Sequence, residues 1–153
     1  MRFSEAMELG RLLLRPMAGH LISPDGLYGC AMGMAGLAVG LRLYLPPCKI
    51  LGVDLKAEEN YEVVAQVWPW INRKFVALIM PCGCVASITH TLIEDYGDVI
   101  THIFDEHVKG NSPRLWTMDM LITWVRSVEP EEESQRSQPA PSVMSDQSVV
   151  HNG

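Results

Sequence analysis

The sequence predicts a mainly α-helical protein with at most a short β element and a disordered C-terminal tail. Its 153 residues suffice for one domain with a sizeable core, and 48% of them are hydrophobic while 20% are charged. Apolar residues recur at helical spacing in several segments. From residue 129 onward the chain is rich in Glu, Ser, Gln and Pro, a composition that buries too little apolar area to offset the entropy of ordering. A single helical domain is therefore expected over 1–128, and a disordered tail over 129–153.

The first helix is expected over residues 4–15. Ser4 can cap it, because its side-chain oxygen can accept a hydrogen bond from a free amide of the first turn. Pro16 disfavours helical geometry at the residue before it and predicts the end of the helix. One face of this helix collects Ala6, Leu9, Leu13 and Met17.

Residues 27–45 form the most apolar stretch of the chain. Small residues recur four positions apart there, which on a helix gives a flat strip that another backbone can approach closely. They are Gly29 and Gly33, Ala31 and Ala35, and Gly36 and Gly40. The uncharged run between Asp25 and Arg42 falls short of the roughly 20 residues that a membrane-spanning helix needs. A buried helix is predicted, with a membrane anchor as the alternative.

The other elements follow from similar patterns. Apolar runs predict β-compatible segments at 49–53 and 75–80, and helical spacing predicts helices over 55–67, 85–96, 98–109 and 118–128. Gly97 is expected to separate the helix over 85–96 from the helix over 98–109, and Thr117 is expected to cap the helix over 118–128.

Charge excludes one class of function. The net charge is −6, and residues 129–153 contribute five acids and one base to it. A near-neutral domain with an acidic tail lacks the basic surface that duplex nucleic acid requires. The first eight residues contain two glutamates and no pattern of a secretory signal, so a cytoplasmic location is expected. In that reducing compartment, cysteines are expected as free thiols or metal ligands.

One set of residues has the composition of a metal site. Cys82, Cys84, His102 and His107 follow the spacing C-x-C-x17-H-x4-H. Zinc prefers four tetrahedral nitrogen and sulfur ligands, and Gly83 permits a tight turn between the two thiols. With four protein ligands the site would be closed and structural, and an acid such as Asp105 could hold a histidine tautomer.

Other interpretations of these residues remain open. The two cysteines could be packed, unreactive thiols or a redox pair. His90 competes with His102 as the third ligand. If only three ligands reach the metal, the fourth position could hold an activated water with Glu106 or Asp105 as base, which would make the protein an enzyme.

Several motifs resemble those of small bacterial and phage-encoded proteins with no assigned activity. Those proteins have an F-S-E-A-x-x-L-G helix, a G-x-C-A-L-G-A-A segment, a C-P-x-C turn, an I-x-H-L-N-D-x-H motif, and a helix after W-[ST] that ends I-x-x-W-V. The matching residues here are Phe3–Ala6, Leu9-Gly10, Gly29–Ala35, Ile100, His102, Asp105, His107, Trp116-Thr117, Ile122 and Trp124-Val125. The resemblance implies that the cysteine turn is coupled to His102 and His107 in a protein that does not span a membrane. This chain departs from it with Cys-Gly-Cys in the turn and a longer loop over 108–115.

Together these observations predict a small accessory or adaptor protein that is stapled by zinc and acts by binding a protein partner. The alternatives are a small metal-dependent enzyme with an open site and a protein anchored in a membrane through residues 27–45.

Overall fold

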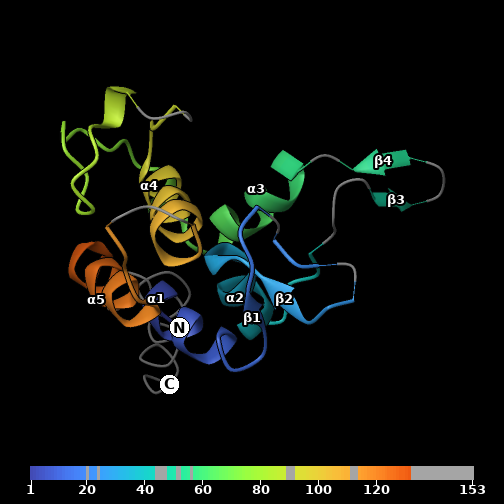
Figure 1. The fold of residues 1–153 in the computed structure, drawn as a ribbon. Helices are drawn as coiled ribbons and strands as arrows, with labels where there is room; N and C mark the ends of the chain where they lie inside the picture. The colour runs from blue at the N-terminus through green and yellow to red at the C-terminus, as the bar shows by residue number, and fades with distance from the viewer. Residues whose placement is uncertain are drawn as a thin grey trace, which may run out of the picture.

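The protein is mainly α-helical, as predicted (Figure 1). The computed structural model describes residues 1–19, 21–23, 25–43, 48–50, 53–55, 57–88, 92–110 and 114–131. Its helices and strands are α1 (Phe3–Gly10), β1 (Arg15–Pro16), β2 (Tyr28–Gly29), α2 (Ala31–Ala38), β3 (Cys48–Ile50), β4 (Val53–Leu55), α3 (Ala57–Val67), α4 (Tyr96–His102) and α5 (Met118–Val128). A π-helix, Ile103–Val108, continues α4, and 3₁₀ turns lie at Pro69–Asn72 and Ala86–Ile88.

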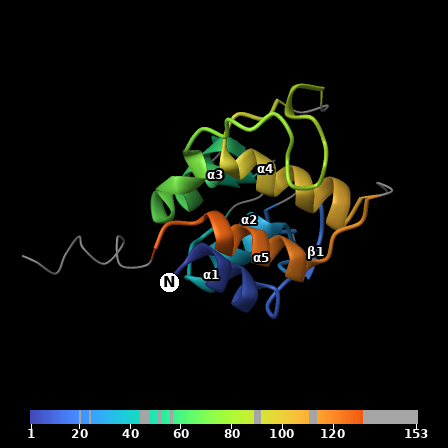
Figure 2. The same ribbon diagram turned by 90° about the vertical axis from the view of Figure 1, so that its left-hand side faces the viewer.

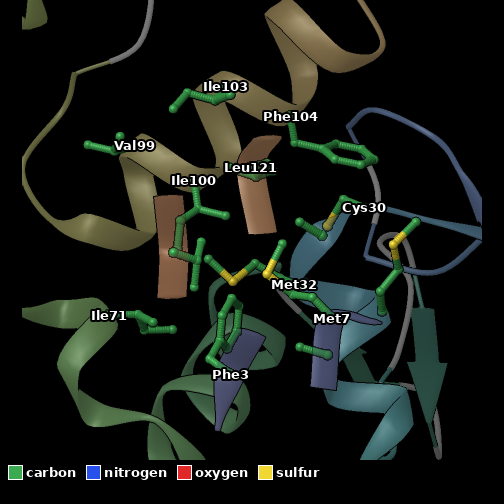
Figure 3. Close-up of a cluster of buried hydrophobic side chains, with 14 of the residues drawn as sticks. Phe3, Met7, Cys30, Met32, Ile71, Val99, Ile100, Ile103, Phe104 and Leu121 are labelled. Carbon is green, nitrogen blue, oxygen red and sulfur yellow. The ribbon is translucent and has the colours of Figure 1, made fainter. Parts of the chain in front are cut away.

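The helices pack around one core. Helix α1 contacts both α2 and α5, while α4 and the π-helix lie over the opposite side of the core (Figures 1 and 2). Phe3 and Met7 of α1 point toward Ile100 and Phe104 on the α4 side (Figure 3). The Phe3 ring also meets Trp68 edge to face, with ring centroids 5.0 Å apart. The strands pair only locally, β1 with β2 in parallel and β3 with β4 as a hairpin.

Two glycines allow backbones to approach closely in this core. A Cβ atom on Gly33 would lie 1.8 Å from the carbonyl oxygen of Leu21, and one on Gly10 would lie 2.0 Å from that of Met34. Any larger side chain would push these segments apart. The predicted close approach along the small-residue strip is thus confirmed at Gly33.

The first two predicted helices are shorter than expected. Helix α1 ends at Gly10, because Arg15–Pro16 pairs with β2 instead of continuing the helix. Helix α2 covers only Ala31–Ala38 of the apolar stretch, and Gly40 follows it with a φ of +82°. Among the described residues, no helix is long and apolar enough to cross a membrane.

The middle of the chain differs most from the prediction. Residues 75–80 do not form a strand; isolated bridges pair Lys74 with Asp95 and Ile79 with Val85, and the Val76 side chain between them is 82% exposed. An apolar run alone does not make a strand when no partner strand lies along it. Where a helix is predicted over 85–96, the described residues before α4 contain a 3₁₀ turn, Ala86–Ile88, and no helix at 92–95.

Gly97 does not break a helix, contrary to the prediction. It lies in the first turn of α4, which Asp95 caps by accepting a hydrogen bond from the Asp98 amide at 2.8 Å. The Tyr61 hydroxyl occupies the space a Cβ at Gly97 would need, 1.5 Å from the ideal position. The cap predicted at Thr117 is confirmed, since its side chain accepts from the Met120 amide at 3.1 Å.

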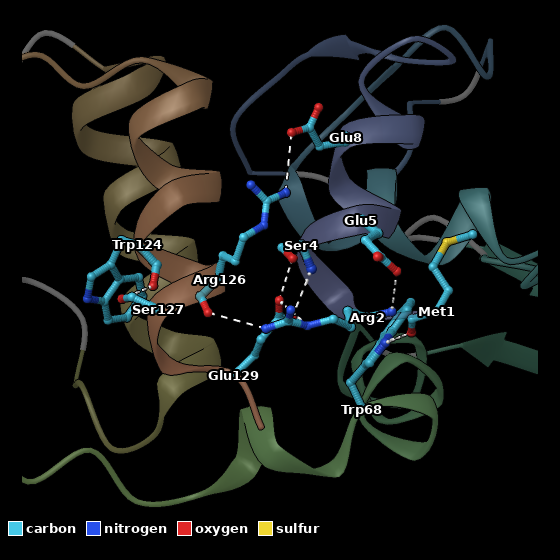
Figure 4. Close-up of polar contacts among 10 residues, drawn as sticks. All are labelled: Met1, Arg2, Ser4, Glu5, Glu8, Trp68, Trp124, Arg126, Ser127 and Glu129. Atoms are coloured by element: carbon cyan, nitrogen blue, oxygen red, sulfur yellow. Dashed lines mark hydrogen bonds and ion pairs between the residues drawn. The ribbon is translucent and has the colours of Figure 1, made fainter. Parts of the chain in front are cut away.

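Glu129, the residue after α5, contacts the N-terminal residues of the chain (Figure 4). Its carboxylate accepts hydrogen bonds from the Ser4 amide, at 3.0 Å, and from the Ser4 hydroxyl, and it pairs with Arg2 Nε at 3.0 Å. Ser4 is therefore not the cap of α1 but the residue that holds Glu129. The predicted tail began at Glu129, yet this residue is 6% exposed and belongs to the folded domain. Residues 132–153 lie outside the described residues.

Candidate metal centre

The two cysteines lie on a tight hairpin, residues 78–86, which we call the thiol hairpin. The Ala86 amide donates to the Leu78 carbonyl at 2.9 Å, and the Met80 amide donates to the Cys84 carbonyl at the same distance. The three residues between Met80 and Cys84 turn the chain, with Gly83 at a φ of +93°. This is the loop geometry in which a turn is followed by a residue in the left-handed region, and glycine fits that region without a steric penalty.

The two histidines face one another because the helix widens between them. The Lys109 amide donates to the Phe104 carbonyl at 2.9 Å, a bond between residues five apart that defines a π-helix. In an α-helix, residues five apart point about 140° away from each other around the axis. Across the π-helix, the rings of His102 and His107 instead meet edge to face, with ring centroids 5.1 Å apart.

The thiol hairpin and the π-helix bring the four predicted ligands together. One ligand atom from each of Cys82, Cys84, His102 and His107 lies within 4.8 Å of all the others. The two histidine Nε2 atoms are 3.3 Å apart, and Cys84 Sγ lies 3.4 Å from His107 Nε2. A tetrahedral zinc ion separates two nitrogen ligands by about 3.3 Å and a nitrogen from a sulfur by about 3.6 Å. The cluster could therefore hold a metal ion.

Arg114 holds both halves of the cluster in place. Its carbonyl oxygen lies 2.7 Å from His107 Nδ1. A carbonyl can only accept, so Nδ1 carries the proton and Nε2 keeps a lone pair aimed at the cluster. The Arg114 guanidinium donates to the Cys82 carbonyl at 3.3 Å and lies against Gly83, where a Cβ would clash with it.

Burial favours the uncharged forms of Cys82 and His102. It raises the pKa of the Cys82 thiol, and the neighbouring Cys84 adds to this effect. Burial also lowers the pKa of His102, as does the nearby His107. In the metal-free protein the Cys82 thiol and the His102 imidazole therefore favour their neutral forms, and a cation that binds to the cluster displaces the thiol proton of Cys82.

A shallow acidic cleft flanks His102. It is lined by Asp98, Thr101, His102, Asp105 and Glu106. Burial raises the pKa of Asp105, whose carboxylate accepts a hydrogen bond from the Gly19 amide at 3.4 Å. Asp105 was expected to hold a histidine tautomer, but for His107 the Arg114 carbonyl does so.

The structure adds Arg114 to the predicted site residues. Sequence reasoning missed Arg114, whose contribution is partly a backbone carbonyl and leaves no trace in residue type. His90, the alternative third ligand, lies outside the described residues. Cys30 is buried in the core at the start of α2, and burial raises its pKa to about 11.

Fold and cluster together define a small, mainly helical protein with a two-cysteine, two-histidine group that could hold a metal ion. No family model matches the chain, and no match was found among curated proteins or solved structures.

Proposed function

We propose that this protein is a small zinc-stapled adaptor that acts by binding a protein partner in the cytoplasm. The observation that carries the proposal is the convergence of four ligand atoms within 4.8 Å from two segments far apart in the sequence. An ion there would tie the thiol hairpin to the helix that carries both histidines. Cytoplasmic conditions would keep both thiols reduced and available to the ion.

Zinc is the metal that this donor set favours. Two thiolates and two imidazoles at tetrahedral separations form a common structural zinc site. Two thiolates would also neutralise the two positive charges of the ion, which suits a site where Cys82 is 4% and His107 is 2% exposed. With four protein ligands the ion has no free position for water, so a structural role is favoured over the catalytic alternative.

Exposed apolar side chains beside the proposed zinc site support the partner-binding part of the proposal. Val76, Leu78 and Ile79 are 82%, 65% and 57% exposed, and they lie three to six residues before Cys82 in the chain. Neighbouring apolar side chains exposed in this way are typical of protein interaction sites. The ion would fix the orientation of the hairpin that presents Leu78 and Ile79.

Metal content tests the first half of the proposal. Elemental mass spectrometry of the purified protein should find about one zinc per chain, and cobalt substitution should give the strong visible bands of a tetrahedral thiolate site. A closed site predicts that added azide or cyanate leaves the cobalt spectrum unchanged. A spectrum that responds to these anions would favour the open-site enzyme, and absence of stoichiometric metal would end the zinc proposal.

Partner capture with matched variants tests the second half. Cross-linking in cells should recover a specific partner with the wild type and lose it with the double substitution Leu78→Ser and Ile79→Ser. The control is Leu12→Ser with Leu13→Ser, which changes two leucines that are also exposed but lie outside the hairpin. Equal loss in both double variants, or in neither, would contradict a docking role for the hairpin.

A further inference from the structure

We propose that Cys82 and Cys84 are also a redox modification site, which a hydroperoxide oxidises to a disulfide with release of the metal ion. This inference rests on the proposed metal site and adds its regulation. The two sulfurs are the only part of the ligand set that can leave the ion by a covalent step, because the imidazoles have no comparable reaction with peroxide.

Local geometry places the two thiols within reach of each other. One residue separates them in the sequence, and their sulfur atoms lie within 4.8 Å. A disulfide needs a sulfur separation of about 2 Å and a specific torsion. Gly83, at a φ of +93°, is the link between them, and a glycine hinge lets the two side chains rotate toward each other as the disulfide forms.

Access distinguishes the two sulfurs. Cys84 is half-buried, whereas Cys82 is 4% exposed, so a peroxide reaches Cys84 first. The Arg114 guanidinium, which donates to the Cys82 carbonyl, places positive charge beside the turn. Reactive cysteines are found in partly exposed, electropositive surroundings of this kind, with a second thiol close by.

The chemistry balances with a hydroperoxide as the only oxidant. The Cys84 thiolate attacks the peroxide, the O–O bond breaks, and Cys84 sulfenic acid and an alcohol form with uptake of one proton. The Cys82 thiolate then attacks the Cys84 sulfur and forms the S–S bond. Hydroxide leaves and takes up a second proton as water. Two electrons pass from the sulfurs to the peroxide, and the ion, left with two imidazoles, dissociates.

Peptide mapping of the zinc-loaded protein tests this inference. Trypsin cuts after Lys74 and Lys109, and the peptide between them contains Cys82 and Cys84 but neither Cys30 nor Cys48. One equivalent of hydrogen peroxide should release one zinc per chain, read with a chromogenic chelator, and make this peptide lighter by two hydrogen atoms. Dithiothreitol with added zinc should reverse both changes. Cys30 should be oxidised at least about tenfold more slowly, because it is buried.

Two variants sharpen the result. Cys82→Ala should stop the reaction at Cys84 sulfenic acid, which dimedone labels, while Cys30→Ala should behave as the wild type. A protein that binds zinc but keeps it under peroxide, or that loses it with sulfinic acid in place of the disulfide, contradicts this inference alone. A protein that binds no zinc contradicts the proposed function as well.

Discussion

If the proposed zinc site is correct, zinc should stabilise this protein, and replacing Cys82 by serine should abolish that stabilisation. A ligand present at a thousand times its dissociation constant adds about 4 kcal/mol to the free energy of unfolding. For a domain of this size, that corresponds to a rise in Tm on the order of 10 °C or more. Serine offers zinc a much weaker ligand than a thiolate, and it breaks the tie between the thiol hairpin and the π-helix.

The measurement is thermal unfolding with zinc and with a chelator, for each variant. Cys30→Ala is the control, because it removes another buried thiol that lies outside the cluster. The difference in Tm between zinc and chelator should be as large for Cys30→Ala as for the wild type. For Cys82→Ser it should be almost zero. The Tm values with zinc and with chelator are compared for the same variant, so a small loss of stability caused by the substitution itself does not affect the result. An equal zinc effect in both variants would exclude Cys82 as a ligand.

Glu129→Ala should be among the most destabilising single substitutions in the chain. The carboxylate is buried and receives the Ser4 amide, the Ser4 hydroxyl and the Arg2 guanidinium (Figure 4). Removing one partner of a buried ion pair costs about 3–5 kcal/mol, because the other groups stay behind without acceptors. The lower end is expected here, since the Arg2 side chain is 22% exposed and water can reach it.

Urea unfolding of matched variants measures this effect. Glu8→Ala is the control, because Glu8 pairs with Arg126 at 3.4 Å on the surface, where both side chains are nearly half exposed. Such a pair contributes at most about 1 kcal/mol. Combining Glu129→Ala with Ser4→Ala should cost less than the sum of the two, because both remove the same contact. A Glu129→Ala cost no larger than that of Glu8→Ala would show that the buried carboxylate does not hold the two ends together.

Residue types and spacing predicted the four residues of the cluster, but not the way in which the chain brings them together. The tight turn between the two thiols could be predicted, because a glycine lies between the two cysteines. By contrast, the five-residue separation of His102 and His107 places them on different faces of an α-helix, and only a π-helix aligns them. The Arg114 carbonyl could not be predicted, since every residue carries one.

Tertiary contacts explain most of the remaining errors. Gly97 is predicted to break a helix, yet it lies within α4, which Asp95 caps, and the Tyr61 hydroxyl fills the space where a side chain would lie. Glu129 was assigned to the tail on composition, which says nothing about a single carboxylate that meets Ser4 from the other end of the domain. Local propensity is a weak guide wherever such contacts decide the structure.

The exposed apolar residues at the start of the thiol hairpin and just before it also bear on self-association. Phe75–Met80 is a six-residue run with no charge, of the kind that forms intermolecular β-sheets when it is left uncovered. Arg73 and Lys74 precede the run and Pro81 follows it, and like charges and proline both oppose edge-to-edge pairing of copies. Positive charge before the run and proline after it thus oppose the pairing of this exposed segment with another copy of the chain.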